Sequence, residues 1–300
     1  MPPRFNNLVL GGGAVRAAAF LGFAEAAGLA AGGAAPRRIV GVSGGAVAAY
    51  VLALGMPVSA AIQIVGRHSG FNAGTAELDL GSLIDDFGIT DIRAPMRALL
   101  DDLLDAWWSE RALLRGDGAT EKPRTFADLA RHTGKDLIVS AVDVDSMRSV
   151  YFGVETTPDV DVHLAICASG AVPLVFCPVA VGGLSCVDGG LLEDVPLGAL
   201  RLRGAPRVRD TLVLQVRDAK RRGARPAPPG DLLAYGKRIL VTLLARGSTQ
   251  PAEARKRVVS VTIQLVGHEG VMTAGADGAQ LYDIYLQGLR AGRTFADGAV

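Results

Sequence analysis

The chain has 300 residues, with 31 Lys and Arg against 30 Asp and Glu, and 49% of its residues are apolar. A chain of this length buries an ample core without metals or disulfides. Its net charge of +1 gives no electrostatic reason to expect nucleic acid, and its apolar content excludes intrinsic disorder. Three cysteines leave an odd thiol under any disulfide scheme and lack metal-site spacing, so we expect a reducing compartment, no metal and no cofactor.

Two stretches without a charged residue, 39–66 and 164–187, are longer than a membrane span requires. Glycine and proline interrupt both stretches, so neither can form one unbroken apolar helix. Such stretches are typical of buried strands and short helices in an α/β core. Arg16 and Glu25 interrupt the apolar region that a secretory signal would need. We therefore expect no transmembrane segment, no classical secretion signal and a cytoplasmic protein, either free or peripheral at membranes.

The first two predicted units have the same order of strand, glycine turn and helix. Asn7–Leu10 is an apolar run that ends in three glycines and precedes an alanine-rich stretch from Ala14 to about Ala30. Arg38–Val42 is followed by the turn at 43–45 and a second alanine-rich stretch to about Leu54. Strands that alternate with such helices pair in parallel, with helices on both faces and functional residues at the carboxyl ends of the strands. The sequence predicts a three-layer α/β/α domain with a central, mostly parallel sheet.

The middle of the chain is acidic, with 11 Asp and Glu against four Arg in residues 75–121. The apolar spacing from Met96 to Trp108 predicts one amphipathic helix. A capped helix and two neighbouring strands are predicted next, at Phe126–His132, Asp136–Asp143 and Ser149–Phe152.

The last third is basic, with 15 Lys and Arg against four acids between Arg201 and Arg257. A helix is predicted at Asp231–Ala245, after a proline-rich loop. The segment 220–246 mixes leucines with basic residues, and two interpretations of it stay open. It packs on the sheet with a solvated basic edge, or it contacts an anionic membrane peripherally.

The change from acidic to basic composition brings no linker and no internal repeat. A late strand is predicted at Val258–Val266. We expect a single domain over residues 1–300, with a core at about 7–200 and a basic portion, 201–300, packed on or extending that core.

The motif at 41–45, Gly-Val-Ser-Gly-Gly, fits a nucleophile elbow, in which a serine lies on a strained strand-to-helix turn. The supporting glycines Gly41, Gly44 and Gly45 permit the tight turn, and the following helix directs its N-terminal dipole at a developing anion. Short patterns of this kind occur by chance, but the preceding strand and following helix supply the required context. Ser43 is the candidate nucleophile.

Three glycines, Gly11, Gly12 and Gly13, end the first strand and expose backbone N–H groups suited to a phosphate or an oxyanion. A dinucleotide-binding fingerprint would need a glycine at Arg16 and an acid at the end of the second strand. Ser43 occupies that second region, which disfavours a dinucleotide. The glycine loop is therefore a candidate oxyanion site.

Asp188 leaves the second uncharged stretch and precedes Gly189 and Gly190. Taken alone, such an aspartate is typical of a turn or a helix cap. Together and in this order, three motifs resemble those of the patatin-like phospholipase family: GGGAVR at 11–16, GVSGG at 41–45 and DGG at 188–190.

The resemblance covers about Asn7–Leu200 and adds little to the basic last third. One departure is Ala17, where the family usually has glycine, and another is Glu193-Asp194, where asparagine is common. Neither touches the reacting atoms, although Ala17 would stiffen the glycine loop.

The resemblance implies a serine lipid acyl hydrolase of the phospholipase A or lysophospholipase type, which acts on a lipid acyl ester through an acyl-enzyme. Ser43 would attack the ester and Asp188 would accept its proton, a dyad rather than a triad. The amides of Gly11–Gly13 would form the oxyanion hole. In the family the Arg16 position orders the loop or meets phosphate, and a purely structural salt bridge is equally compatible.

Two alternatives stay open. An α/β-hydrolase triad would use Ser43, Asp188 and His268, although hydrolase elbows of that type normally follow several strands and Ser43 follows only the second. The other alternative is a non-catalytic lipid-binding module of the same fold. The histidines at 68, 132 and 163 have no partners at metal spacing.

Overall fold

The computed structural model describes residues 4–32, 35–68, 90–115, 121–203, 210–219, 258–268 and 276–298. Its strands are β1 (Asn7–Leu10), β2 (Arg38–Val42), β3 (Asp136–Asp143), β4 (Arg148–Gly153), β5 (Val179–Val181), β6 (Leu184–Asp188), β7 (Thr211–Asp218) and β8 (Val259–Leu265). Its α-helices are α1 (Ala18–Ala26), α2 (Gly44–Leu54), α3 (Val58–Arg67), α5 (Arg93–Arg115), α6 (Phe126–Thr133), α7 (Val162–Gly170) and α11 (Gly278–Ala296). Three 3-10 helices are η1 (Ala14–Ala17), η2 (Gly189–Leu191) and η3 (Leu197–Arg203).

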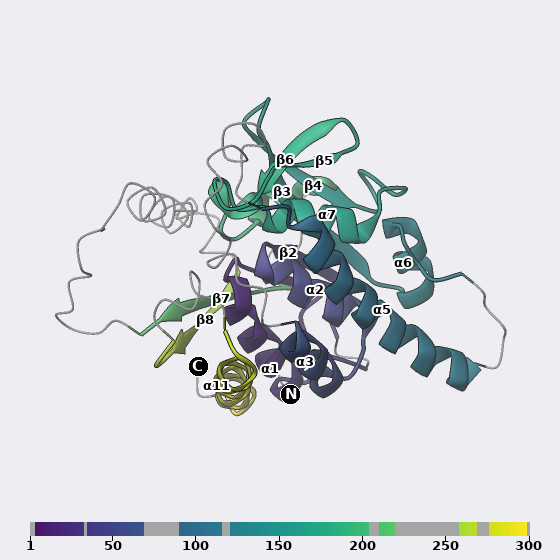
Figure 1. The fold of residues 1–300 in the computed structure, drawn as a ribbon. Helices are drawn as coiled ribbons and strands as arrows, with labels where there is room; N and C mark the ends of the chain where they lie inside the picture. Colours follow the sequence, from purple (N-terminus) through teal and green to yellow (C-terminus); the bar gives the residue numbers. More distant parts are fainter. Residues whose placement is uncertain are drawn as a thin grey trace.

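The strands form one sheet in the order β5-β6-β3-β2-β1-β7-β8, with β4 paired to β3 (Figure 1). β1 pairs in parallel with β2 and β7, and β2–β3 and β7–β8 are parallel as well. The pairs β3–β4, β3–β6 and β5–β6 are antiparallel. The sheet is mixed and mostly parallel, and helices flank it, which confirms the predicted fold class and a single domain.

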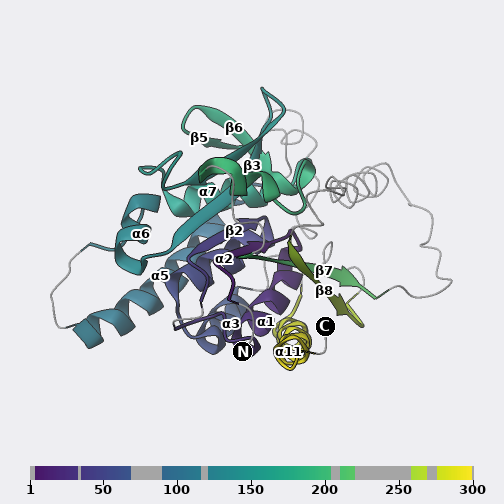
Figure 2. The same ribbon diagram turned by 180° about the vertical axis from the view of Figure 1, so that it is seen from behind.

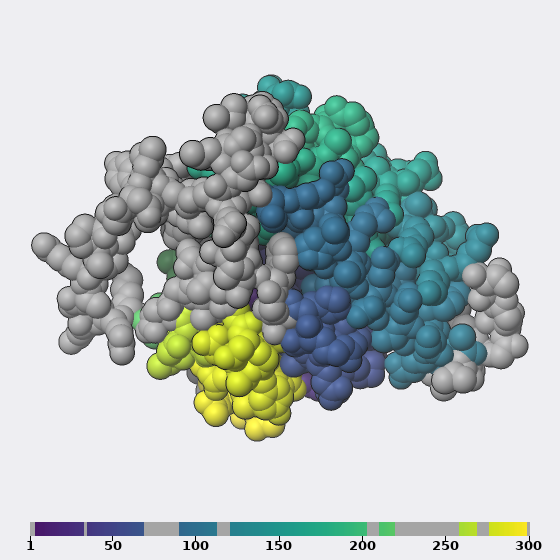
Figure 3. All heavy atoms as spheres, viewed as in Figure 1, coloured from purple at the N-terminus to yellow at the C-terminus, as the bar shows by residue number. Residues whose placement is uncertain are grey.

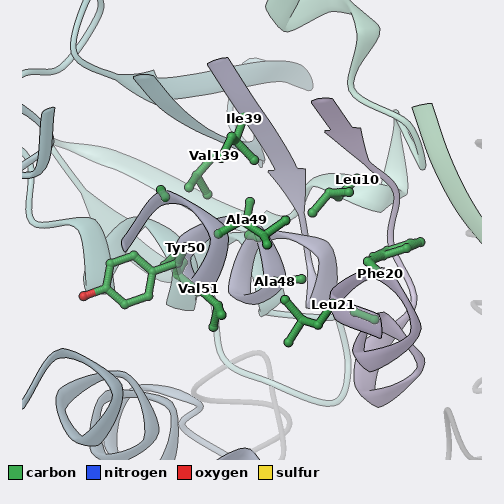
Figure 4. Packing of buried hydrophobic residues seen from close by; sticks show 14 of the residues in the cluster. Leu10, Phe20, Leu21, Ile39, Ala48, Ala49, Tyr50, Val51 and Val139 are labelled. Carbon is green, nitrogen blue, oxygen red and sulfur yellow. The ribbon is translucent and has the colours of Figure 1, made fainter. Parts of the chain in front are cut away.

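Side chains alternate along each buried strand, so each strand contributes to a core on both faces of the sheet. The two cores differ in size. In β1, Leu8 and Leu10 join the large core that the α-helices cover, whereas Val9 joins a smaller core on the opposite face. Figure 4 shows the large core from close by, with Ile39 and Val139 of neighbouring strands above Ala49 of α2. The smaller core is closed by the segment 195–202, which includes most of η3.

Most of the predicted elements are confirmed. Strands are present at Asn7–Leu10, Arg38–Val42 and Asp136–Asp143, and Thr125 caps α6 through a reciprocal capping box with Asp128. The first predicted helix is shorter than expected and begins with the 3-10 turn η1, because Ala14 leaves the glycine loop at a φ of 48°. The predicted helix at 231–245 and the segment 220–246 lie outside the described residues.

The chain beyond residue 200 supplies part of the central sheet, since β7 lies between β1 and β8. The views from both sides show the β7–β8 pair and the β5–β6 hairpin at opposite ends of the sheet (Figures 1 and 2). β7 was not predicted from the sequence, although its run Thr-Leu-Val-Leu-Gln-Val is typical of a buried strand. The late strand β8 is confirmed.

The C-terminal helix α11 packs along α1, and its surface lies next to α3 (Figure 3). Close approach of the two helices depends on glycine. A Cβ at Gly22 would overlap the carbonyl of Tyr285, and a Cβ at Gly288 would overlap that of Ala19. Among the described residues, no helix combines the length and apolar character that crossing a membrane requires.

Candidate active site

The register of the sheet brings Ser43 and Asp188 together. β4 pairs with one edge of β3 over residues 138–143, so β2 and β6 must share the other edge. β2 runs parallel to β3 as far as Val42, opposite Ser140, and β6 runs antiparallel and ends with Asp188 opposite Ala141. The two strands thus run toward each other and end at consecutive positions of β3. Ser43, the residue after Val42, therefore meets Asp188.

Ser43 has the strained backbone of a nucleophile elbow, with φ 55° and ψ −131° between β2 and α2. A non-glycine residue at positive φ is uncommon and persists only where the surroundings impose it. Those surroundings are tight here, because a Cβ at Gly44 would overlap the backbone of Ala14 and a Cβ at Gly45 would overlap that of Gly11. A Cβ at Gly41 would stand 2.5 Å from the carbonyl oxygen of Gly45. The glycines of the motif therefore allow the turn to pack on the glycine loop.

The glycine loop lies against Ser43 with two of its three N–H groups engaged. Gly11 donates to the carbonyl of Leu214 at 3.0 Å, and Gly12 donates to the carbonyl of Asp194 at 2.9 Å. A Cβ on Gly12 would stand 3.9 Å from the Cβ of Ser43. Within the ranges that the structure describes, the N–H of Gly13 donates to no carbonyl.

Arg16 ties the glycine loop to the end of β7. Its Nη1 donates to Asp218 Oδ2 at 3.0 Å, and its Nε donates to the carbonyl oxygen of Gly13 at 3.3 Å. The arginine side chain is 11% exposed. The geometry therefore includes the structural salt bridge, which was one of the two roles expected for this residue.

Asp188 is only 2% exposed, and its Oδ1 accepts a hydrogen bond of 2.7 Å from the N–H of Gly190. Burial raises the pKa of this carboxyl to about 6. The Ser43 hydroxyl and the Gly190 N–H lower the pKa in part, and the negative charge of Asp194 raises it. The result is a carboxylate that is ionised at neutral pH and more basic than a surface aspartate.

Gly189 allows the end of β6 to lie flat against its neighbours. A Cβ there would stand 2.5 Å from the carbonyl oxygen of Ser140 and 2.8 Å from Val42 Cγ2. The glycine after the aspartate is thus required by the meeting of the two strands. Gly190 contributes through the N–H that it donates to Asp188.

His268 lies away from these residues. It follows β8, and three strand spacings of about 4.8 Å separate β8 from β2, a distance of about 14 Å. Its Nε2 is 2.7 Å from Asp283 Oδ2 of α11. This pairing argues against a triad that contains Ser43 and Asp188. Among the described residues, no group of three His, Cys, Asp or Glu side chains could hold a metal ion.

Ser169 was not among the predicted site residues, although it contacts the elbow directly. Its Oγ accepts a hydrogen bond of 2.8 Å from the backbone N–H of Ser43. A hydroxyl in the last turn of a largely apolar helix, at Ala168-Ser169-Gly170, is the signal that the sequence offered.

Comparison with known proteins supports the fold. VipD from Legionella pneumophila has a similar structure, with a TM-score of 0.57 and 17% identity, over 99% of this chain and 67% of VipD. The ExoU–SpcU complex from Pseudomonas aeruginosa contains a chain with a TM-score of 0.50 and 20% identity, over 99% of this chain and 52% of that one. Identities this low establish a shared fold only.

Comparison of sequences identifies the family. The chain is 24% identical over 197 residues to the probable lipid hydrolase 463L of Invertebrate iridescent virus 6. The match covers 65% of this chain and 63% of the viral protein. The family model of the patatin-like phospholipases matches residues 8–201, which include the elbow, the glycine loop and Asp188. With nearly two thirds of its length in that match and with the fold described above, the chain belongs to the patatin-like phospholipase family.

Proposed function

We propose that this protein hydrolyses acyl esters of lipids, as a phospholipase A or lysophospholipase, with Ser43 as nucleophile and Asp188 as base. The observation that carries the proposal is the strained Ser43 elbow, placed by the sheet register beside a buried carboxylate. Family membership and the viral relative described as a probable lipid hydrolase support the same activity.

In the first half of the reaction, the Ser43 oxygen attacks the ester carbonyl carbon while the hydroxyl proton passes to Asp188. The tetrahedral intermediate then collapses, and the leaving alcohol takes the proton back from Asp188. In the second half, Asp188 removes a proton from water, which attacks the acyl-enzyme. The fatty acid leaves, and the proton returns to Ser43.

The oxyanion of each tetrahedral intermediate needs N–H donors that are not already engaged. Since Gly11 and Gly12 donate to backbone carbonyls, they hold the loop in place, and we assign the donor role within it to Gly13. The N-terminus of α2, at Gly44, directs its dipole to the same place. Loss of one such donor typically costs about 3 kcal/mol of transition-state stabilisation.

The proposal is tested with a fluorophosphonate probe and a short-chain nitrophenyl ester, followed by phospholipid vesicles. Wild type is expected to be labelled and to release product. Ser43→Ala is expected to abolish both, and Asp188→Asn to slow both by several orders of magnitude. Ser59→Ala, at an exposed serine of α3, is the matched control and should behave as wild type.

Absence of labelling in wild type, or equal labelling after Ser43→Ala, would contradict the proposal and leave a non-catalytic lipid-binding module. His268→Ala separates dyad from triad. The dyad predicts unchanged turnover, whereas a loss of several orders of magnitude in a folded variant would show that the histidine takes part.

A further inference from the structure

The meeting of β2 and β6 on β3 leaves a break in the hydrogen-bond ladder next to the nucleophile. Val42 lies opposite Ser140, so a continued β2 would place Ser43 opposite Ala141. That position is occupied by Asp188 at the end of β6. The N–H of Ser43 is half-buried and has no acceptor within the ladder, so it needs one outside it.

The hydroxyl of Ser169 spans this break. Its Oγ accepts a hydrogen bond of 2.8 Å from the Ser43 N–H and donates one of 2.6 Å to the carbonyl of Ser140. Ser169 lies in the last turn of α7 and is fully buried. A hydroxyl is small and both donates and accepts, so it replaces the missing N–H···O=C bond with an N–H···O–H···O=C chain.

The same end of α7 also holds the aspartate. The backbone N–H of Asp188 donates to the carbonyl of Ala171 at 2.9 Å. Residues 169–171 thus contact the backbone of both proposed catalytic residues, one through a side chain and the other through a carbonyl. The separation of Ser43 from Asp188 is therefore set by one short segment as well as by the sheet.

We infer that Ser169 is a positioning residue, whose hydroxyl holds the Ser43 elbow in its strained conformation and keeps Ser43 Oγ aligned with Asp188. This inference rests on the proposed function of that pair. Strained backbone persists only where neighbouring groups impose it, and the Ser43 amide has Ser169 as its hydrogen-bond partner. Ser169 acts on the geometry of the nucleophile and takes no part in proton transfer.

The test compares Ser169→Ala, which removes the hydroxyl, with Ser169→Thr, which keeps it. Ile166→Val is the matched control, because Ile166 is fully buried in the same helix one turn earlier. Turnover of the nitrophenyl ester, the rate of fluorophosphonate labelling and urea unfolding are measured for each variant. All rates are normalised to the folded fraction.

Ser169→Ala is expected to lower kcat about 10- to 100-fold, as small misplacements of reacting groups do, with KM within about twofold. Ser169→Thr should recover most of that loss. The midpoint of the acid limb in the pH–rate profile should move upward, since the Ser43 hydroxyl lowers the pKa of Asp188 and would no longer be aligned with it. Ile166→Val should retain the kcat of wild type.

Different failures have different meanings. Wild type that neither reacts with the probe nor turns over ester overturns the proposed function and, with it, the role of Ser169. Active wild type with an equally active Ser169→Ala variant overturns the positioning role alone. Equal loss in Ser169→Ala and Ile166→Val overturns it as well, because the effect would then be general destabilisation of α7.

Discussion

At the scale of single residues, Asp188 is subject to two opposing demands. In its proposed role as base it gains from burial, because exclusion from water raises its pKa to about 6 and strengthens its affinity for the Ser43 proton. Burial also lowers the stability of the folded protein, because the charged carboxylate is poorly solvated there. Two hydrogen-bond donors, the Ser43 hydroxyl and the Gly190 N–H, offset only part of that loss.

The first prediction concerns pH and activity. The proposed base, Asp188, must be ionised, so kcat/KM should rise with pH through an acid limb centred near 6 and fall about tenfold per unit below it. Stopped-flow or plate-reader hydrolysis of the nitrophenyl ester between pH 4.5 and 8 measures the limb. A midpoint near 4, the ordinary value for aspartate, would show that burial does not control this group.

The second prediction concerns stability. Folding raises the pKa of Asp188 from about 4 to about 6, so the folded state holds the proton more tightly and stability falls as pH rises through that window. Asp188→Asn removes the charge and keeps an oxygen for the Gly190 N–H. The free energy of unfolding of this variant should therefore be about 2 to 3 kcal/mol higher than that of wild type at pH 7 and almost the same as that of wild type at pH 4. Urea unfolding at both pH values measures the difference, and a variant less stable than wild type at pH 7 would contradict it.

At the scale of elements, helix packing is governed by small residues where α1 crosses α11. Gly22 on α1 and Gly288 and Gly292 on α11 each stand where a Cβ would meet the backbone of the other helix. The two backbones approach so closely that no side chain fits between them. This contact anchors the C-terminal helix to the first helix of the chain.

The third prediction follows from that contact. Gly288→Ala should lower the free energy of unfolding by about 1 to 3 kcal/mol, because the new methyl group overlaps the carbonyl of Ala19 and the helices must separate. Gly278→Ala is the control on the same helix, since a Cβ there meets nothing within 4 Å. The control should be neutral or slightly stabilising, as alanine favours helix over glycine. Equal effects of the two changes, measured by urea unfolding, would exclude the packing explanation.

At the scale of the whole molecule, the family match and the sheet end at different places. The family model stops at residue 201, whereas the first half of β7 (Thr211–Asp218) pairs with the whole of β1. β1 in turn pairs with β2, which leads to Ser43. The support of the proposed nucleophile therefore reaches into the last third of the chain.

The fourth prediction is that a chain shortened to residues 1–203 does not fold cooperatively. It would turn β1 into an edge strand and uncover the faces of α1 and β1 that α11 and β7 bury. Circular dichroism during urea unfolding, with the full chain beside it, makes the comparison. A sharp transition near that of the full chain would show that residues up to 203 form a complete domain.

Much of the fold could be predicted from local pattern. Asn7–Leu10 and Arg38–Val42 are apolar runs that end at glycine turns, and both are strands with these bounds. The Ser43 elbow was predictable for the same reason, because strand, turn and helix are consecutive in the chain and the glycines that the turn needs are part of the motif. β7 has a similar apolar pattern but was not predicted, because it lies within the basic last third of the chain.

The sequence by itself determined the class of fold, the candidate nucleophile and the order of the motifs, because each motif and each strand-turn-helix unit is recognised within a short stretch of the chain. Only the tertiary structure decided that Asp188, 145 positions after Ser43, ends beside it, since that depends on two strands sharing one edge of β3. The structure also decided that Gly11 and Gly12 are engaged and that Ser169 supports the elbow. Such contacts join distant segments, and the choice among them is made by register and packing, which no local pattern records.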